Sequence, residues 1–190
     1  MKSVDQILKI KATVLYILGR MPEGVDYIHL FKVMYFAQQE HLVKYGLPLM
    51  EDTFCARRHG PVPSLTYKVL KNAEIGGDFD EEAMREFRNA LKVEVRDGIQ
   101  VVTARQPYDD EELSLSDIAV LDDVIEKCRD IESFKLSDIS HDKAWKTAQK
   151  TADRTGESAK IPLYDIAKAG GANQAMLDII RERQWTEHHL

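Results

Sequence analysis

The sequence lacks the features that mark secreted and membrane proteins. Among its 190 residues are only two cysteines, Cys55 and Cys128, which argues against a disulfide framework and favours a reducing compartment. No run approaches the roughly 18 consecutive apolar residues of a membrane span. Charges interrupt the N-terminal segment, which argues against a secretory signal. We therefore expect a cytoplasmic protein that does not bind a membrane.

Familiar motifs for metals and phosphates are also missing. The six histidines form no His-Glu-x-x-His motif, and the two cysteines form no Cys-x-x-Cys pair. The glycine pairs at 76–77 and 170–171 stand alone, so they are better explained as helix ends than as phosphate-binding loops. The sequence therefore predicts no metal site and no cofactor.

A catalytic centre is equally hard to find. Cys55 lies close in sequence to Arg57, Arg58 and His59, which would lower the thiol pKa if they faced it. Nothing nearby supplies the orienting acid that a catalytic triad requires, so a small buried cysteine is the simpler interpretation. We expect no catalytic residue and no enzymatic activity. A cysteine hydrolase is the rival hypothesis that a Cys55 substitution would test.

The balance of charge disfavours nucleic acid as the main partner. The formal net charge is −6, whereas binding to a phosphate backbone needs clustered lysine and arginine. One segment departs from this average, because residues 54–73 contain no acidic side chain but four basic ones, Arg57, Arg58, Lys68 and Lys71. This basic segment would fit an acidic partner surface, although scattered solvated charges would give the same count.

Helical periodicity dominates the chain. Apolar residues recur at spacings of three and four over most of the sequence, which predicts about six or seven helices. The first covers residues 4–18, and the second runs from a capping Asp26 to about residue 45. The fold class is therefore expected to be mainly α.

Serines are expected to mark the starts of the later helices. Ser64, Ser114 and Ser140 each precede a stretch with helical periodicity, and each has a side chain that can cap a helix. Residues 137–141 are interpreted as a short connector, and residues 151–160 as a polar loop.

One β-hairpin stands out against the helical background. At residues 92–103, two runs rich in β-branched residues flank Asp97-Gly98, a dipeptide that favours a type I′ turn. An extended segment near Phe54 is a candidate for one more short strand, and residues 59–63 are interpreted as a proline-containing turn. The expected architecture is a compact helical domain with one hairpin.

Several motifs together resemble those of the Panacea, or SocA-like, antitoxin family. A Lys-hydrophobic-hydrophobic-Tyr-Phe-Ala-Gln run comes first, followed by a Gly-x-Pro-Leu element, a Gly-Pro-Val turn and a Leu-Ser-x-x-Ser-His element before a Trp. The matching positions are 32–38, 42, 46–49, 59–63, 67, 136–141 and 145. The resemblance covers about residues 5–150. Two positions depart from it, because Arg57 stands where many members carry Trp and His59 where many carry Tyr.

The resemblance implies a function and a domain plan. It implies a bacterial, often phage-associated antitoxin that binds and neutralises a cognate toxin encoded nearby, with some members acting as adaptors that deliver the toxin to an ATP-dependent protease. We expect a helical domain at residues 1–150, which includes the hairpin 92–103. A C-terminal helical extension at residues 151–190 is expected to pack on the same domain.

The candidate partner contacts lie in the basic segment, where the Gly-Pro-Val motif also falls. They are Arg57, Arg58, His59, Tyr67 and Lys68. Neighbouring residues of an extended segment point to opposite faces, so at most one of the two arginines is expected to be an anchor.

A DNA-binding regulator of a prophage or mobile-element operon is the alternative. In that reading the hairpin 92–103 would be the wing of a winged-helix arrangement. The charged residues of the hairpin are nearly balanced, whereas phosphate contacts should be basic. Nucleic acid is therefore disfavoured as a partner, although this alternative stays open.

Overall fold

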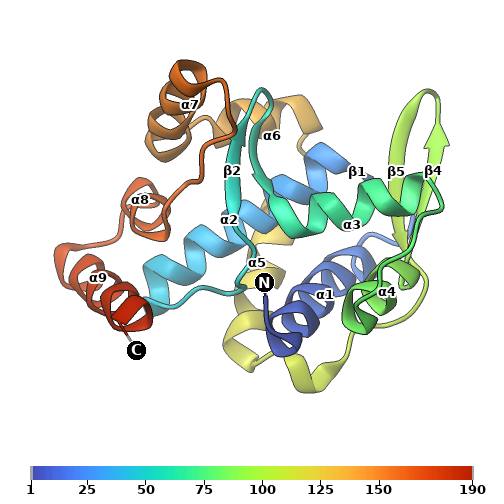
Figure 1. The fold of residues 1–190 in the computed structure, drawn as a ribbon, viewed down its shortest axis with the longest axis horizontal. Coiled ribbons are helices and arrows are strands. Elements are labelled where there is room, and N and C mark those ends of the chain that lie inside the picture. Colours follow the sequence, from blue (N-terminus) through green and yellow to red (C-terminus); the bar gives the residue numbers. More distant parts are fainter. Residues whose placement is uncertain (1, 190) are drawn as a thin grey trace.

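Helices account for most of the described chain. The computed structural model describes residues 2–189, with side chains placed for residues 2–186. Its α-helices are α1 (Val4–Gly19), α2 (Tyr27–Tyr45), α3 (Ser64–Glu74), α4 (Glu82–Asn89), α5 (Leu115–Cys128), α6 (Ser133–Ser140), α7 (Lys143–Thr155), α8 (Leu163–Ala169) and α9 (Gln174–His189). Its strands are β1 (Val25–Asp26), β2 (Phe54–Arg57), β3 (Gly60–Pro63), β4 (Leu91–Arg96) and β5 (Ile99–Ala104), and a short 3-10 helix, η1, spans Asp110–Glu112. The mainly α class is confirmed, although nine α-helices within this range exceed the six or seven predicted (Figure 1).

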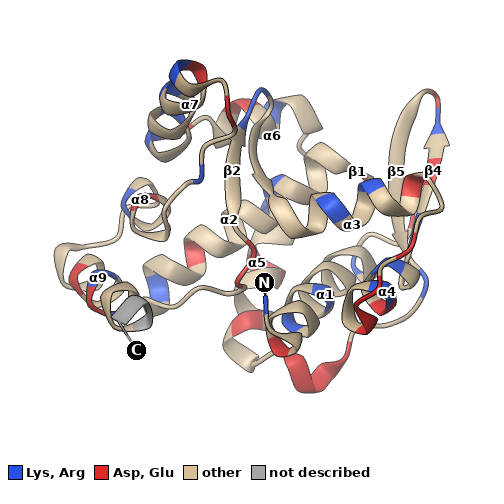
Figure 2. Cartoon of the chain, viewed as in Figure 1, with Lys and Arg blue, Asp and Glu red and all other residues tan. Residues whose placement is uncertain are grey.

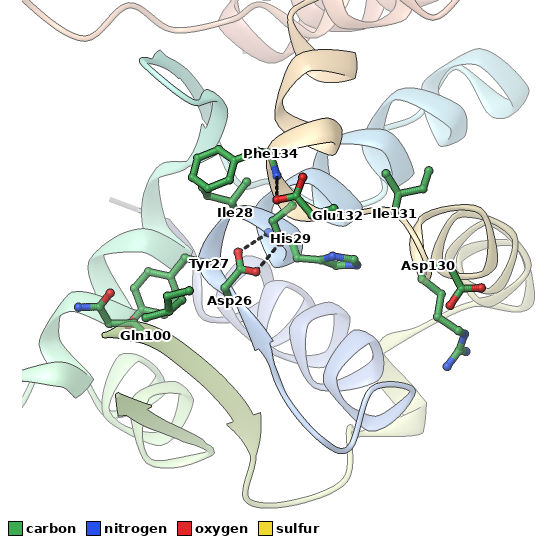
Figure 3. A pocket seen from close by; sticks show the side chains of 12 residues that line it. Asp26, Tyr27, Ile28, His29, Gln100, Asp130, Ile131, Glu132 and Phe134 are labelled. Carbon is green, nitrogen blue, oxygen red and sulfur yellow. Dashed lines mark hydrogen bonds between the residues drawn. The ribbon is translucent and has the colours of Figure 1, made fainter. Parts of the chain in front are cut away.

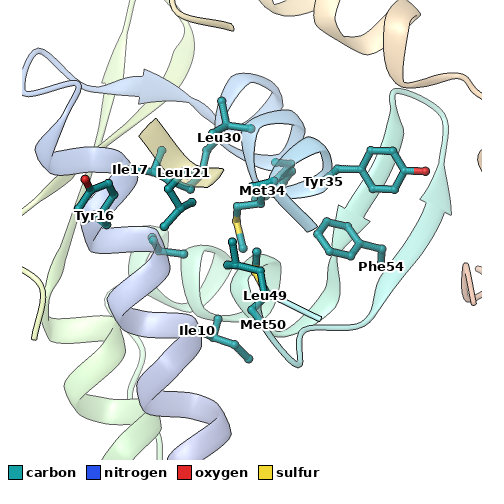
Figure 4. Packing of buried hydrophobic residues seen from close by; sticks show 14 of the residues in the cluster. Ile10, Tyr16, Ile17, Leu30, Met34, Tyr35, Leu49, Met50, Phe54 and Leu121 are labelled. Carbon is teal, nitrogen blue, oxygen red and sulfur yellow. The ribbon is translucent and has the colours of Figure 1, made fainter. Parts of the chain in front are cut away.

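Helix α2 runs through the middle of the molecule and packs against α1, α5, α6, α8 and strand β3 (Figure 1). It begins at Asp26 as predicted, because the carboxylate accepts a 3.0 Å hydrogen bond from the backbone N–H of His29. It ends at Gly46, where φ is 68°. Buried side chains surround most of the helix, and Figure 4 shows Met34 and Tyr35 among residues of α1 and of the segment after α2.

Strands β4 and β5 form the predicted hairpin. They pair antiparallel around Asp97, with φ of 51°, and Gly98, with φ of 79°. Positive φ at both positions is what a type I′ turn requires. Strand β1 adds to the other edge of β5, with Val25 opposite Val102. The sequence does not predict this third strand, because two residues carry too little pattern to be recognised.

Residues 59–63 mostly form strand β3, which corrects the turn expected there. This strand pairs with β2, the short strand expected near Phe54. Pro61 lies opposite Ala56, whose backbone N–H donates away from β3, to the carbonyl of Ala159. The proline therefore faces no β2 group that needs its missing N–H, which is why the strand tolerates it.

Two of the three expected serine caps are wrong. Ser64 is the first residue of α3, and the carboxylate of Asp52 instead accepts hydrogen bonds from the first turn of that helix. Ser140 is the last residue of α6, so most of the expected connector at 137–141 is helical, and Asp142 caps α7. In both places an aspartate outside the predicted position supplies the acceptor that the helix start needs.

Helices α5 and α7 show one confirmed start and one displaced end. Ser114 caps α5 and forms a capping box with Asp117, as predicted. Helix α7 continues to Thr155, so the first half of the expected loop at 151–160 is helical. The helix ends where Gly156 adopts φ of 73°.

The C-terminal helices share the hydrophobic core with the rest of the chain. Ile166 and Ala167 of α8 and Leu177 and Ile180 of α9 are buried in the same cluster as the side chains of α2. The division of the chain at residue 150 stays a prediction. Among the described residues, none of the helices combines the length and apolarity needed to cross a bilayer.

Candidate functional site

Helices α6 and α7 hold the tip of the hairpin β2–β3 by its backbone. The hydroxyl of Ser137 donates a 2.9 Å hydrogen bond to the carbonyl of His59. The indole N–H of Trp145 donates a 3.0 Å hydrogen bond to the carbonyl of Arg57. The indole stacks on the ring of His141, with 3.8 Å between the centroids and 13° between the planes. Bonding to the backbone leaves the exposed side chains at the tip, Arg57, Arg58 and His59, free to face outward.

A buried lysine of α2 holds the second strand of the hairpin. The Nζ atom of Lys32 donates a 2.8 Å hydrogen bond to the carbonyl of Pro61, and the side chain is 1% exposed. Burial lowers the pKa of Lys32 to about 7. Gly60 packs directly against this side chain, and a Cβ there would lie 2.4 Å from the Ser140 hydroxyl and 2.8 Å from the Lys32 Cε atom. Glycine is therefore required where the hairpin crosses α2 and α6.

Asp142 joins α7 to α2. Its carboxylate caps α7 by accepting a 2.9 Å hydrogen bond from the N–H of Trp145. The other oxygen accepts hydrogen bonds from the hydroxyl of Tyr35 at 2.7 Å and the amide of Gln39 at 3.1 Å. Burial raises the pKa of Tyr35, so its hydroxyl stays protonated and keeps donating. The position of α7 beside the hairpin is fixed by these contacts.

A groove lies between the hairpin and the C-terminal end of α7. We call it the hairpin groove; its cavity volume is about 640 Å³. Its residues come from four places: the hairpin, the first turns of α2, helix α3 and the end of α7. They include Tyr27, Phe31, Lys32, Arg57, Arg58, His59, Val62, Tyr67, Asp153 and Glu157.

Aromatic rings form the floor of the hairpin groove. The centroids of Tyr27 and Phe31 are 5.8 Å apart, and those of Phe31 and Tyr67 are 6.2 Å apart. The guanidinium of Arg57 lies over the ring of Tyr67, 4.9 Å from its centroid. An arginine stacked on an aromatic ring is held in place yet keeps its N–H groups available to a partner.

A model of the antitoxin SocA-like, Panacea domain family matches residues 30–146, which is more than half of the chain. The chain belongs to this family. No curated protein and no solved structure gives a significant match.

The SocA-like, Panacea match covers one wall of the groove and not the other. It includes the hairpin, α3 and the start of α7, and it ends at residue 146. The opposite wall, with Asp153 and Glu157, lies beyond the matched residues. Four residues of the motifs that resemble the family hold the hairpin β2–β3 in place: Lys32, Gly60, Ser137 and Trp145. Their contacts explain the motif as a scaffold.

The structure brings four of the five candidate contacts together. Arg57, Arg58, His59 and Tyr67 all line the hairpin groove. Lys68 lies in a different hollow, where its ammonium is 5.5 Å from the ring of Phe79. The sequence does not show that α2 contributes to the groove, because Tyr27 and Phe31 are far from the hairpin along the chain. Their aromatic side chains at a spacing of four residues are the only signal of this contribution.

A second hollow of about 620 Å³ adjoins the groove and shares Tyr27 and Ile28 with it (Figure 3). Phe134 stands at its edge, is 56% exposed and contacts the ring of His59 edge to face at 5.8 Å. His29 is 7% exposed, and its Nε2 atom has no hydrogen-bond partner among the described residues. Burial lowers the pKa of His29, which favours the neutral ring.

The thiol of Cys55 lies beside the first residue of α3. Its sulfur lies 3.2 Å from the hydroxyl of Ser64, and within the described residues no hydrogen bond joins it to a histidine. No group of three or more His, Cys, Asp or Glu side chains within the described part of the chain is placed to hold a metal.

Proposed function

We propose that this protein is an antitoxin that binds its cognate toxin in the hairpin groove and thereby neutralises it. Membership of the antitoxin SocA-like, Panacea domain family is the observation that carries this role. The groove supports the location, because it gathers four of the five contacts that the sequence singles out. We expect this binding in the cytoplasm, where the two free cysteines would stay reduced.

The composition of the groove favours a protein partner. Aromatic and arginine side chains are enriched at the centres of protein interfaces, and they supply most of the binding energy there. Arg57 is the better anchor of the two arginines, because stacking on Tyr67 orders it before the partner arrives. Less side-chain entropy is then lost on binding.

The charges on the two walls define the partner segment. Arg57 and Arg58 stand on the hairpin side, whereas Asp153 and Glu157 stand on the α7 side. We expect the bound segment of the toxin to be apolar at its centre. It should be acidic where it faces the hairpin and basic where it faces α7, because complementary charges fix the register of a complex.

Co-expression with the product of the adjacent gene tests the proposal. That product should be toxic alone and harmless with this protein, and the two should co-purify. The double variant Arg57→Glu, Arg58→Glu should restore toxicity and abolish co-purification. The double variant Lys68→Glu, Lys71→Glu is the matched control, because it makes the same change of net charge within the basic segment but outside the groove.

Each failure has its own meaning. A neighbouring product that is harmless alone would remove the antitoxin role. If the variant with Arg57→Glu and Arg58→Glu still neutralises the toxin, the contact lies outside the groove. Loss of rescue in the Lys68 and Lys71 control alone would move the contact to the outer face of α3. Thermal unfolding of each variant shows whether the fold is retained.

Neutralisation by blocking and neutralisation by delivery to an ATP-dependent protease differ in the lifetime of the toxin. We propose blocking, because the groove is shaped to hold a segment of the partner. The toxin should then persist as a stable complex after synthesis is stopped. Rapid loss of the toxin only when this protein is present would instead establish the adaptor mechanism.

A further inference from the structure

The outer face of α7 carries four basic side chains in a row. We call this the basic face of α7: Lys143, Lys146, Lys150 and Arg154. Their spacings of three, four and four residues place them within an arc of about 80° on the helix. All four are exposed, and the opposite side of the helix packs against β2 and α8.

These four cations are uncompensated. Within the described residues, none of the four forms an ion pair, whereas Lys44, Lys92 and Lys127 elsewhere on the surface each contact a carboxylate. Residues 143–160 hold five basic and two acidic side chains in a chain whose net charge is −6. Figure 2 shows α7 at one corner of the molecule, away from the acidic stretch around η1.

The basic face of α7 lacks what a protein interface needs. The exposed positions beside its cations are Thr147, Thr151 and Asp153, so no apolar or aromatic side chain is available there to be buried by a partner. Lysine is depleted from protein interfaces, and their energy comes mainly from buried aromatic and apolar anchors. Point charges without apolar anchors instead match phosphates, which are bound largely by electrostatic attraction.

We propose that the basic face of α7 binds the phosphate backbone of duplex DNA. From Lys143 to Arg154 the face is about 16 Å long, and about 16 Å of the DNA axis carries about five phosphates of each strand. Single-stranded nucleic acid is bound on aromatic stacking platforms, and this face has none. Helix α7 stands at a corner of the fold (Figure 1). It can therefore approach the wide major groove of DNA, whereas the major groove of duplex RNA is too narrow.

This location differs from the hairpin 92–103, which would be the wing of a winged-helix arrangement. In the hairpin β4–β5, Glu94 lies 2.7 Å from Lys92 and 3.1 Å from Arg96, so the cations of the hairpin are neutralised locally. The contact with DNA is therefore assigned to α7. Phosphate contacts carry no sequence information by themselves, so binding is independent of sequence.

Fluorescence anisotropy with a labelled duplex DNA of mixed sequence tests the proposal. Four phosphate contacts predict that log K falls with log salt concentration with a slope of about −3.6. The triple variant Lys143→Gln, Lys146→Gln, Lys150→Gln should reduce the slope to about −0.9. Its affinity at low salt should fall at least about tenfold. Single-stranded RNA should bind more weakly than the duplex.

A matched variant separates location from total charge. The control is the triple variant Lys44→Gln, Lys92→Gln, Lys127→Gln. It also removes three positive charges, but from other parts of the surface, and it should keep the salt dependence of the wild-type protein. Equal losses in both triple variants would overturn the proposal, and so would tighter binding to single-stranded RNA. The α7 variant should also still protect cells from the toxin. If it loses rescue while the wild-type protein binds no DNA, the basic face is a protein contact.

Discussion

The Nζ atom of Lys32 donates a hydrogen bond to the carbonyl oxygen of Pro61 from inside the hydrophobic core. A buried amine bound to a single carbonyl ties the most central helix to the strand that shapes the groove. No carboxylate is hydrogen-bonded to this amine among the described residues, so its charge is stabilised only weakly. The wall of the hairpin groove is thus held by a group whose protonation is sensitive to pH.

Gly60, in the hairpin β2–β3, should be hard to replace. Its φ of 98° is strained for other residues, and a Cβ there would collide with Ser140 and Lys32. We expect Gly60→Ala to lower the free energy of unfolding by roughly 3 kcal/mol or more. Gly156→Ala is the control, because φ is 73° there and nothing lies within 4 Å of the added Cβ. It should cost about 1 kcal/mol, and equal costs in urea unfolding would contradict the steric argument.

Lys32 should give the protein a recognisable dependence of stability on pH. Its pKa is about 7 in the folded chain and about 10.4 in an unfolded one. Between these values the unfolded state binds the extra proton, so the free energy of unfolding rises with pH, by at most about 1.4 kcal/mol per unit. Lys32→Met should remove this rise, and Lys150→Met, at an exposed lysine, should keep it. Urea unfolding at several pH values from about 7 to about 10 measures the difference.

Asp142 and Tyr35 should be energetically coupled. Asp142→Ala removes the cap of α7 and leaves the buried Tyr35 hydroxyl without its acceptor. We expect a loss of about 3 kcal/mol, of which the cap is about 1. Tyr35→Phe should cost less in the Asp142→Ala background than in the wild-type protein. A double-mutant cycle that shows no coupling would mean that the 2.7 Å contact contributes nothing.

Features that depend on neighbours in sequence were predictable from the sequence. The type I′ hairpin at Asp97-Gly98 and the cap at Asp26 each need only local backbone chemistry, and both are present. The sequence does not predict strand β3, because prolines normally break strands. Only the pairing register, which places Pro61 opposite Ala56, shows that its missing N–H is not needed.

The site was predictable on one wall only. The charge and turn chemistry of Arg57 to His59 are visible in the sequence, whereas the opposite wall at Asp153 and Glu157 is brought there by the position of α7. The basic face of α7 was hidden for a related reason. The sequence predicts a polar loop at residues 151–160, whereas α7 continues to Thr155 and places Arg154 on the same helix as Lys143.

Asp117 should make the core sensitive to acid. Its carboxylate is buried and lies 2.9 Å from the Lys9 ammonium and 3.1 Å from His41. Burial alone would raise its pKa, but the close contact with His41 and the hydrogen bonds with Lys9 and Ser114 outweigh burial and hold the pKa well below its usual range. The folded state thus favours the charged form. The stability contributed by this group is therefore complete above about pH 5 and is lost as the pH falls below about 4.

Replacing the carboxylate separates this buried pair from a surface one. Asp117→Asn should lower the free energy of unfolding by about 2 kcal/mol at neutral pH, because the Lys9 ammonium, whose side chain is 35% exposed, loses its counter-charge. The deficit should shrink as the pH falls, since the wild-type carboxyl then loses its own charge. Asp123→Asn is the control: this residue pairs with Lys127 at the surface with its side chain 43% exposed, so it should cost under about 0.5 kcal/mol. Equal losses for the two variants in urea unfolding at neutral pH, or a deficit at Asp117 that does not change with pH, would show that packing rather than charge holds α1, α2 and α5 together at this point.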